Sequence, residues 1–583
     1  MTQSPGAASS SGAAPSPGAA VRRHAVFLAL ALLAGAVLVF LARRTTFWQD
    51  EWGVIDYQRS LADILKPLNE HWSTIPILLY RTTFSIVGLH SYLPYIAQVI
   101  VLHLIAVAAA YVLMTPRIGR LAAAVASIPL LLLGSGAENL FWAFQTGFVG
   151  SVAFGLWALV LLERTGRWSL VGASLLLIAS LMSSGIGVVM VAAAVARTIL
   201  DPVDRRRFVA TIPPIVVYVL WFFAFGRGGV RAGEFAGPLQ LAAFVRRGLE
   251  FAVGGMTGLA FVPFGGFLAV AVFIGACAVT AWGLLRASWK PTLAAASLFA
   301  ILVEYGVIGF TRATLPGDFA NRSRYIYIAA FFIVLAVVDW IPNLRAWAGD
   351  VRGRRVAVVA GLAVVLVASL AANAIDMRHN RALANDHADR TRAAIEFDLS
   401  PEATAPWVDP AARVPGMPDS TRIGAIVAAS GSPLEDRLFP MVAAKPSGRI
   451  RENTLLLMLG SNFRIEPSSG GGSTRQLEAG EIHDVAADAA SGCVRLHDAG
   501  PAAAATFTVP GGDRLRVTAT DALRGSVAIG KDRPPSRTID LAVPAGAKMD
   551  VVVPDLGDGS SFALRLGLPS ATGSTTVCLV EPF

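Results

Sequence analysis

Long apolar runs recur along the first 375 residues, and their length predicts helices that cross a membrane. A helix needs about 20 predominantly apolar residues to span a bilayer, and runs such as "AVFLALALLAGAVLVFLA" approach that length. The expected spans lie at about 24–42, 93–114, 120–135, 147–163, 168–182, 185–200, 208–225, 264–285, 291–311, 325–342 and 356–374. The pattern predicts a polytopic α-helical membrane protein with about 11 transmembrane helices.

One further apolar segment decides the predicted topology. Residues 74–89, "TIPILLYRTTFSIVGL", are short for a span and carry Arg81 in their middle. If they lie in the interface, the basic loops "RRH", "PRIGR", "ERTGR", "DPVDRRR", "RASWK" and "RAWAGDVRGRR" all face the cytoplasm, as the positive-inside rule requires. If they span, the later loops are inverted. We favour the interfacial position, with a cytoplasmic N-terminus, an extracytoplasmic C-terminal region and the plasma membrane as location. The exceptions to the rule are Arg43, Arg44, Arg246 and Arg247.

The two ends of the chain differ in composition from this apolar body. Residues 1–20 contain mainly Ser, Gly, Pro and Ala, which predicts a disordered cytoplasmic tail. The transmembrane body covers residues 21–375. After it, "RHNRALANDHADRTRAAIEFDL" reads as a polar helix and opens an extracytoplasmic soluble domain at residues 376–583.

Short alternating runs begin in this domain at about residue 490. Runs such as "RLRVTAT", "TIDLAVP" and "MDVVVP" are separated by Gly, Pro and Asp, a pattern typical of a β-sandwich or jelly roll. Cys493 and Cys578 fall in the first and last of these strands, whereas Cys277 falls in an apolar run. The first two cysteines could pair, because disulfides persist outside the cytoplasm.

Composition agrees with a membrane protein and argues against a nucleic-acid-binding one. The chain is 54% hydrophobic and 15% charged, with a mean hydropathy of +0.57. Its formal net charge is +9. In so apolar a chain, basic residues more often mark cytoplasmic loops than a nucleic-acid surface, so we expect no nucleic-acid partner.

The predicted first external loop, residues 43–92, places Asp50 and Glu51 beside each other between Trp48 and Trp52. The loop is long and carries amphipathic segments, which is more often functional than a simple connection. The alternative is that the two tryptophans anchor the interface and the acids between them are simply solvated.

A family resemblance adds to this pattern. The Asp-Glu pair after the first apolar helix, the loop segment "NEHWSTIPILLYRTTFSIVGLHSYLPY" and the multi-span body resemble the GT-C glycosyltransferases, over roughly residues 20–375. Within them the chain is most similar to protein O-mannosyltransferase-like and actinobacterial arabinofuranosyltransferase-like enzymes. The resemblance implies a GT-C-like fold, a catalytic acid in the first external loop and a polyprenyl-phosphate sugar donor. The loop lacks an Asp-x-Asp, so the likeness to metal-dependent oligosaccharyltransferases is weaker.

The acid pair suits the chemistry of glycosyl transfer. A base takes the proton of the acceptor hydroxyl, and repulsion between adjacent carboxylates raises the proton affinity of one of them. We predict Asp50 as the base and Glu51 as the residue that positions the acceptor or tunes Asp50, although the reverse order is also compatible with the sequence. No metal site or cofactor is predicted. A divalent cation such as Mg²⁺ or Mn²⁺ stays open, because oxygen ligands suit these ions.

A second predicted outer loop, "GSGAENLFWAFQTGF", supplies further candidates for acceptor or sugar contacts. They are Glu138, Asn139 and Gln145, since GT-C enzymes often bring a second acid from a later external loop. The alternative is a helix cap and an aromatic interface belt. His71 is a weaker candidate, because a lone His near Trp72 is more often structural.

Arginines in the segment "TRATLPGDFANRSRYIY" are candidates for the donor phosphate. Arg312, Arg322 and Arg324 lie on the predicted outer side, and a guanidinium binds phosphate with two hydrogen bonds. Arg246 and Arg247 are a second choice. Attraction to anionic lipid headgroups is the alternative for all five.

The sequence therefore predicts a membrane glycosyltransferase that moves a sugar from a polyprenyl-phosphate donor to a cell-envelope glycan, lipid or protein on the extracytoplasmic face. The expected partners are the donor, the acceptor and membrane lipids. The alternative is a polysaccharide polymerase or a lipid-linked glycan transporter or flippase. A transporter should carry charges near the bilayer midplane or internal repeats, whereas most acids and arginines here gather at the predicted outer ends. A non-enzymatic scaffold would leave the elaborate first loop unexplained.

Overall fold

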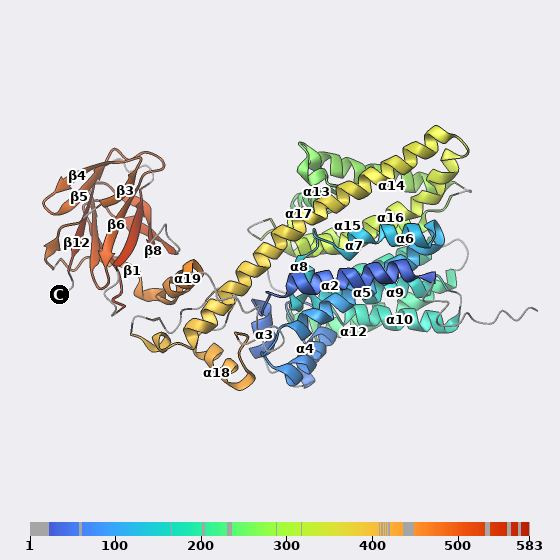
Figure 1. The fold of residues 1–583 in the computed structure, drawn as a ribbon, viewed down its shortest axis with the longest axis horizontal. Coiled ribbons are helices and arrows are strands. Elements are labelled where there is room, and N and C mark those ends of the chain that lie inside the picture. The colour runs from blue at the N-terminus through green and yellow to red at the C-terminus, as the bar shows by residue number, and fades with distance from the viewer. Residues whose placement is uncertain are drawn as a thin grey trace, which may run out of the picture. The chain divides into compact units, whose positions relative to one another are not determined.

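The computed structural model describes residues 23–581 with internal gaps, and it divides them into two compact units (Figure 1). The gaps are 57–60, 165, 201–204, 230–235, 287–288, 316–317, 407, 410–411, 413, 415–416, 418–419, 435–447, 471, 478, 531–536, 557–560 and 569–572. The helical unit comprises Met1–Arg43, Arg59–Thr83 and Leu93–Ala384, and the second unit comprises Arg44–Gln58, Phe84–Tyr92 and Asn385–Phe583. The predicted tail at residues 1–20 lies outside the described residues.

The helical unit is built from the apolar runs of the sequence. Its helices are α2 (Ala25–Ala42), most of α4 (Thr74–Val87), α5 (Leu93–Ile118), α6 (Arg120–Ala126), α7 (Ile128–Leu131), α8 (Glu138–Phe141), α9 (Thr146–Leu162), α10 (Arg167–Leu181), α11 (Gly187–Ile199), α12 (Ile212–Ala224), α13 (Pro238–Thr257), α14 (Gly265–Leu285), α15 (Thr292–Arg312), α16 (Ser323–Ala348) and the first part of α17 (Arg352–Asp398). Short 3₁₀ turns join them at η1 (Leu61–Leu65), η2 (Ala143–Gln145), η3 (Arg205–Thr211), η4 (Gly226–Gly229), η5 (Leu259–Phe261) and η6 (Phe319–Asn321).

Eight helices among the described residues are long and apolar enough to cross a membrane. They are α2, α5, α9 with η2, α12 with most of η3, α14, α15, α16 and α17. Shorter apolar helices occupy the expected spans at 120–135, 168–182 and 185–200 and the segment at 74–87. The chain is therefore a multi-pass α-helical membrane protein, as predicted, while the number of about 11 spans stays a prediction.

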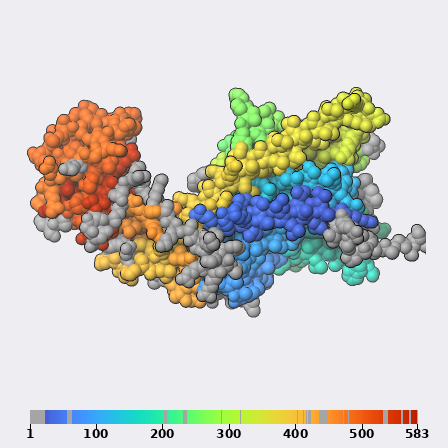
Figure 2. All heavy atoms as spheres, in the orientation of Figure 1, coloured from blue at the N-terminus to red at the C-terminus, as the bar shows by residue number. Residues whose placement is uncertain are grey.

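Small residues allow the helices to pack closely, as is usual within a membrane. A Cβ atom on Gly155 of α9 would lie 2.5 Å from Met190 of α11, and one on Gly248 of α13 would lie 2.1 Å from Tyr305 of α15. The outer surface is apolar in contrast: on α2, which Figure 2 shows at the surface of this unit, Leu32 and Leu33 are exposed. Such a surface suits contact with lipid chains.

An ion-pair network fixes one end of the bundle. Arg117 of α5 donates to Glu163, which follows α9 (2.7 Å), and to Asp339 of α16 (2.9 Å). The other carboxylate oxygen of Asp339 accepts the N–H of Ala294 at the start of α15 (3.0 Å). Because α5 and α9 end here and α15 begins here, Arg312 at the end of α15 lies at the opposite end. We call the two ends the Arg117 end and the Arg312 end.

Helix α13 was not among the expected spans, because Arg246, Arg247 and Glu250 interrupt its apolar run. The structure pairs both guanidiniums with the Glu250 carboxylate, which is 9% exposed. A Cβ on Gly309, near the end of α15, would contact Phe244 of α13. Gly255, a turn from the other end of α13, lies against Ser135, in the loop before α8. Helix α13 therefore lies along the Arg312 end rather than across the bundle.

Helix α17 runs without interruption for 47 residues and belongs to both units. Its residues up to Ala384 pack with the helical unit, and those from Asn385 belong to the second unit. The predicted domain boundary between residues 375 and 376 thus falls inside a continuous helix.

The second unit combines short helices with a β-sandwich. It contains α3 (Asp50–Asp56), the end of α4, the end of α17, η7 (Pro401–Thr404), α18 (Ser420–Ser430), α19 (Gly448–Met458) and η9 (Gly460–Asn462). Its strands are β1 (Arg464–Pro467), β2 (Thr474–Arg475), β3 (Ala479–His483), β4 (Ala486–Ala490), β5 (Cys493–His497), β6 (Ala504–Pro510), β7 (Arg514–Ala519), β8 (Leu523–Gly530), β9 (Arg537–Val543), β10 (Lys548–Val552), β11 (Ser561–Gly567) and β12 (Thr575–Val580).

The described strands form two antiparallel sheets, as the alternating pattern predicted. One has the order β1-β10-β7-β12-β5-β4, with β2 added to β12, and the other has the order β3-β6-β11-β8-β9. Alternate residues of β7, namely Leu515, Val517 and Ala519, are buried, which is the period of a strand with one face on a core. Cys493 on β5 and Cys578 on the neighbouring β12 form the predicted disulfide.

Candidate functional site

The acid pair lies at the start of α3, in the second unit, and its two side chains differ in environment. Glu51 is fully buried: it accepts the backbone N–H of Trp48 (3.0 Å) and the hydroxyl of Tyr92 (3.0 and 3.2 Å). The Trp48 contact resembles half of a capping box, in which a helix residue reaches back to the N-terminal N–H. Asp50 is exposed. The geometry therefore gives Glu51 a role in fixing the segment, and it leaves Asp50 on the accessible side.

Side chains of α17 hold this segment in place within the second unit. The indole of Trp48 stacks on the imidazole of His387, with ring centroids 4.0 Å apart and planes at 13°. Arg392 donates to the backbone carbonyl of Arg44 (2.8 Å), and Arg44 pairs with Asp389 (3.6 Å). A stacked aromatic pair and two polar contacts thus orient the residues before Asp50, so the acid pair has a defined place in the unit.

A second polar cluster lies at the Arg312 end of the helical unit. The guanidinium of Arg312 donates to both oxygens of Glu70, at 3.0 and 3.5 Å, and the two side chains are 22% and 16% exposed. His71 follows directly. Desolvation and the nearby positive charge of Arg312 lower the pKa of His71 to about 4, against a smaller opposing effect of Glu70. His71 is therefore neutral at physiological pH and can accept a proton or a hydrogen bond.

Aromatic contacts hold the loop before this cluster against α12. The rings of Trp72 and Trp221 stack with centroids 4.9 Å apart, and the Trp221 indole N–H donates to the carbonyl of Leu65 (2.8 Å). The indole N–H of Trp72 donates to the Thr74 hydroxyl (2.8 Å), which donates to the carbonyl of Ile64 (2.8 Å). This loop is therefore built on the helical unit, which fixes the backbone on both sides of Glu70.

Glu138 and Asn139 attach α8 to the beginning of α16. The Glu138 carboxylate accepts the backbone N–H of Arg324 (3.3 Å) and pairs with its guanidinium (3.5 Å). The Asn139 amide donates to the Arg324 carbonyl (2.9 Å), and Ser323 donates to the carbonyl of Ser135 (2.8 Å). These contacts fit the helix-cap alternative for Glu138 and Asn139. Their role in acceptor or sugar contacts stays a prediction.

The remaining predicted residues fall into different environments. Gln145 is buried in η2, and its side-chain carbonyl has no hydrogen-bond partner in the described part of the chain. Arg322 is exposed, and its guanidinium lies 5.2 Å from the centre of the Phe319 ring. Within the described residues it has no carboxylate partner, in contrast to Arg312 and Arg324. Arg246 and Arg247 are both paired with Glu250. Of the predicted phosphate ligands, Arg322 is thus the one left open.

The structure therefore groups the predicted residues into two sets. At the Arg312 end, Arg324 is contacted by Glu138 and Asn139. Arg312 pairs with Glu70, the residue directly before His71, and its charge lowers the pKa of His71. Asp50 and Glu51 form their own set in the second unit. Sequence reasoning did not select Glu70. Its signal was the Asn-Glu pair of "NEHWS", because Asn favours the left-handed backbone of a tight turn.

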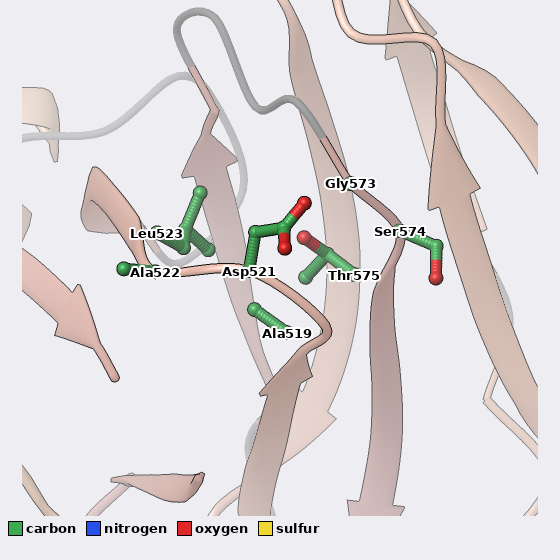
Figure 3. A pocket seen from close by; sticks show the side chains of 7 residues that line it. All are labelled: Ala519, Asp521, Ala522, Leu523, Gly573, Ser574 and Thr575. Carbon is green, nitrogen blue, oxygen red and sulfur yellow. The ribbon is translucent and has the colours of Figure 1, made fainter. Parts of the chain in front are cut away.

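In the described part of the chain, neither a cluster of metal-ligating side chains nor a pocket of ligand size indicates a further functional site. Among the residues that the structure describes, no three His, Cys, Asp or Glu side chains come together as a metal site would require. A pocket in the sandwich lies between the β7–β8 connection and the start of β12, where Asp521 and Thr575 line it (Figure 3). The space open to a water-sized molecule is about 10 Å³, far below the range of about 300–1,000 Å³ for small-molecule sites.

Comparison with known proteins gives two similar solved structures. No family model matches the chain, and no curated protein matches it. The oligosaccharyltransferase of Archaeoglobus fulgidus, in a complex with Zn and sulfate, is 14% identical over 60% of this chain, with a TM-score of 0.37. The chain spans about half of that protein, 53% of its length.

The second similar structure is ArnT from Cupriavidus metallidurans bound to undecaprenyl phosphate. It is 15% identical over 70% of this chain and 88% of its own, with a TM-score of 0.40. Both neighbours belong to the GT-C glycosyltransferases, the superfamily that the sequence resembles. Because both TM-scores are below 0.5, the assignment of function rests on the residues of this chain.

Proposed function

We propose that this chain is a membrane glycosyltransferase that moves a sugar from a polyprenyl-phosphate donor to a glycan, lipid or protein acceptor on the extracytoplasmic face of the plasma membrane. The observation that carries the proposal is the gathering of Arg312, Arg322 and Arg324 at one end of an apolar helical bundle, with Arg322 exposed. Guanidiniums at the membrane surface suit a phosphate whose lipid chain lies among apolar helices.

The charge distribution supports the orientation in the membrane. The Arg117 end carries many basic residues at helix termini: Arg117, Arg164, Arg167, Arg197, Lys290, Arg345 and Arg352. The positive-inside rule assigns such an end to the cytoplasm, and the arginines of the opposite end, Arg43, Arg44, Arg246, Arg247, Arg312, Arg322 and Arg324, are exceptions to it. The N-terminus belongs to the same end, because His24 before α2 contacts the hydroxyl of Tyr111, late in α5 (2.9 Å). The Arg312 end is then extracytoplasmic, as is the second unit, most of which follows Arg312 in the chain.

The proposed reaction assigns a role to each acid of the pair. The acceptor hydroxyl oxygen bonds to the anomeric carbon of the sugar while the bond from that carbon to the phosphate oxygen breaks. The exposed carboxylate of Asp50 takes the hydroxyl proton, and polyprenyl phosphate leaves with the bonding electrons. Glu51, buried under Trp48 and Tyr92, positions Asp50 through the backbone.

Transfer of radiolabelled sugar from polyprenyl-phosphate donors tests the proposal, in membranes with matched amounts of each variant. Asp50→Asn should lose nearly all transfer and Arg322→Gln should raise the KM for the donor. Asp386→Asn is the matched control, because Asp386 is an exposed acid of the same unit that pairs with Arg390. Equal transfer by Asp50→Asn and the wild type would contradict the assignment of the base.

One observation favours the alternative of a lipid-linked glycan transporter or a polymerase. Glu304 is fully buried in the middle of α15, and neither carboxylate oxygen has a hydrogen-bond partner in the described part of the chain. Ionisable residues at such depth often mark transport pathways. If no donor supports transfer but wild-type membranes translocate a lipid-linked glycan and Glu304→Gln membranes do not, the transporter replaces the glycosyltransferase.

A further inference from the structure

The carboxylate of Glu70 is presented by a tight and conformationally unusual turn. Leu68 and His71 exchange both backbone hydrogen bonds, each 2.9 Å long, and close a two-residue turn. The two residues inside the turn, Asn69 and Glu70, have φ angles of +47° and +72°. This is the left-handed geometry of a type I′ turn, which favours Asn and Gly. Glutamate in that region costs on the order of 1 kcal/mol, so the position of Glu70 calls for a functional explanation.

The backbone beneath this carboxylate is fixed on both sides. A Cβ atom on Gly185 would lie 2.8 Å from Nδ1 of His71, so the imidazole fills the space that this glycine leaves. On the preceding side, a Cβ on Gly229 would lie 2.6 Å from the ring of Pro67. With the backbone held between these contacts, Glu70 can change partner through its side chain alone.

The partner of Glu70 is a group that also suits phosphate. Arg312 offers two N–H donors, and the two oxygens of Glu70 accept them in the arrangement that two phosphate oxygens would take. We call these two N–H donors the fork of Arg312. An anion that binds both donors must therefore displace Glu70. Because the pair is mostly buried, an unpaired guanidinium here would be costly. When no anion is bound, between reaction cycles, the Glu70 carboxylate pairs with the guanidinium of Arg312 and so avoids this cost.

We propose, on the basis of the glycosyltransferase function above, that Glu70 is a reversible occupant of the phosphate-binding fork of Arg312. The donor phosphate displaces the carboxylate when it binds, and the carboxylate returns when the polyprenyl phosphate leaves. Glu70 thereby competes with donor and product alike and accelerates product release. It is a positioning residue that acts through Arg312, without a role in the bond-forming step.

Binding of farnesyl phosphate, a short-chain polyprenyl phosphate, to the full chain in phosphatidylcholine nanodiscs tests this inference. Glu70→Gln should bind about tenfold more tightly than the wild type, because it removes the charge that competes for Arg312; a tenfold change corresponds to about 1.4 kcal/mol. Glu70→Asp should remain close to the wild type. Arg312→Gln should weaken binding, and in the Arg312→Gln background the gain from Glu70→Gln should disappear, as a double-mutant cycle requires for a direct pair.

Steady-state transfer gives an independent readout. Glu70→Gln should lower both the KM for the donor and kcat, because the product leaves more slowly. A purely structural Glu70 would lower kcat without tightening binding. The matched control is Glu396→Gln, which breaks the exposed pair with Arg451 and should change neither quantity. Thermal unfolding of each variant verifies that it is folded.

The outcomes separate this inference from the proposed function. Unchanged or weaker binding by Glu70→Gln, with wild-type binding intact, overturns the role of Glu70 and leaves the proposed function standing. Absence of farnesyl phosphate binding in the wild type overturns both. If phosphatidylglycerol in the nanodisc abolishes the gain of Glu70→Gln, the fork binds lipid headgroups, and the assignment to the donor is wrong.

Discussion

Removal of the disulfide between Cys493 and Cys578 should destabilise the sandwich by several kcal/mol. The bond joins directly opposed positions on the neighbouring strands β5 and β12, and 85 residues separate the two cysteines. A cross-link that closes a loop of this length lowers the entropy of the unfolded chain, which corresponds to about 4.5 kcal/mol at 25 °C. The equilibrium constant for unfolding of the double variant Cys493→Ser/Cys578→Ser should therefore rise on the order of 10³-fold.

Pulse proteolysis of the full chain in detergent, after equilibration in urea, measures this change by the loss of the sandwich. For an m-value of about 1.5 kcal/mol/M, the urea midpoint should fall by about 3 M. Cys277→Ser is the control, because this free cysteine lies on α14 and should leave the midpoint unchanged. A shift below about 0.5 M, less than 1 kcal/mol at that m-value, would show that the unfolded chain retains structure that already brings the two strands together.

The same cysteines test the orientation in the membrane. The single variant Cys493→Ser leaves a thiol at Cys578, which a membrane-impermeant maleimide should label in intact cells if the sandwich is extracytoplasmic. Wild-type cells should show such labelling only after reduction of the disulfide. Labelling that requires permeabilised cells would place the sandwich in the cytoplasm and reverse the proposed topology.

Three further changes have defined expected results, each measured by thermal or pH-dependent unfolding of the full chain in detergent. Asp339→Asn should lower the free energy of unfolding by about 1–3 kcal/mol, because it weakens the ion pair with Arg117 and the hydrogen bond from the Ala294 N–H. An unchanged Tm would show that Glu163 alone satisfies Arg117. Glu304→Leu should leave stability unchanged or raise it by about 1–3 kcal/mol, since it removes a buried carboxyl that has no hydrogen-bond partner among the described residues; a large loss would mean that Glu304 holds an ion or a proton donor. The pKa of His71 is about 4 in the folded protein and 6.5 in the unfolded chain, so protonation favours unfolding. Its contribution to stability is complete above pH 6.5 and declines as the pH falls toward 4, and His71→Asn should remove that part of the pH dependence; an identical pH profile would refute the assignment.

The hydrophobic pattern by itself determined the class of the protein and the position of most helices. Apolar runs near bilayer length can be satisfied only by helices, because lipid leaves no water to bond an exposed backbone. All the expected spans accordingly fall in helices. Period-2 alternation with turn residues likewise determined the sandwich, and the cysteines in the first and last of the alternating runs indicated the disulfide.

The tertiary structure decided what sequence spacing leaves open. The sequence favoured Asp50 as the base but left the reverse order open, and only packing against Tyr92 made Glu51 the buried member of the pair. Glu70 and Arg312 are 242 residues apart, so no local pattern could join them. Helix α13 departs from the hydrophobic pattern because Glu250 neutralises its arginines through contacts one turn along the helix. The sequence determines which residues lie at the ends of the apolar helices, whereas long-range packing decides which of their charges meet.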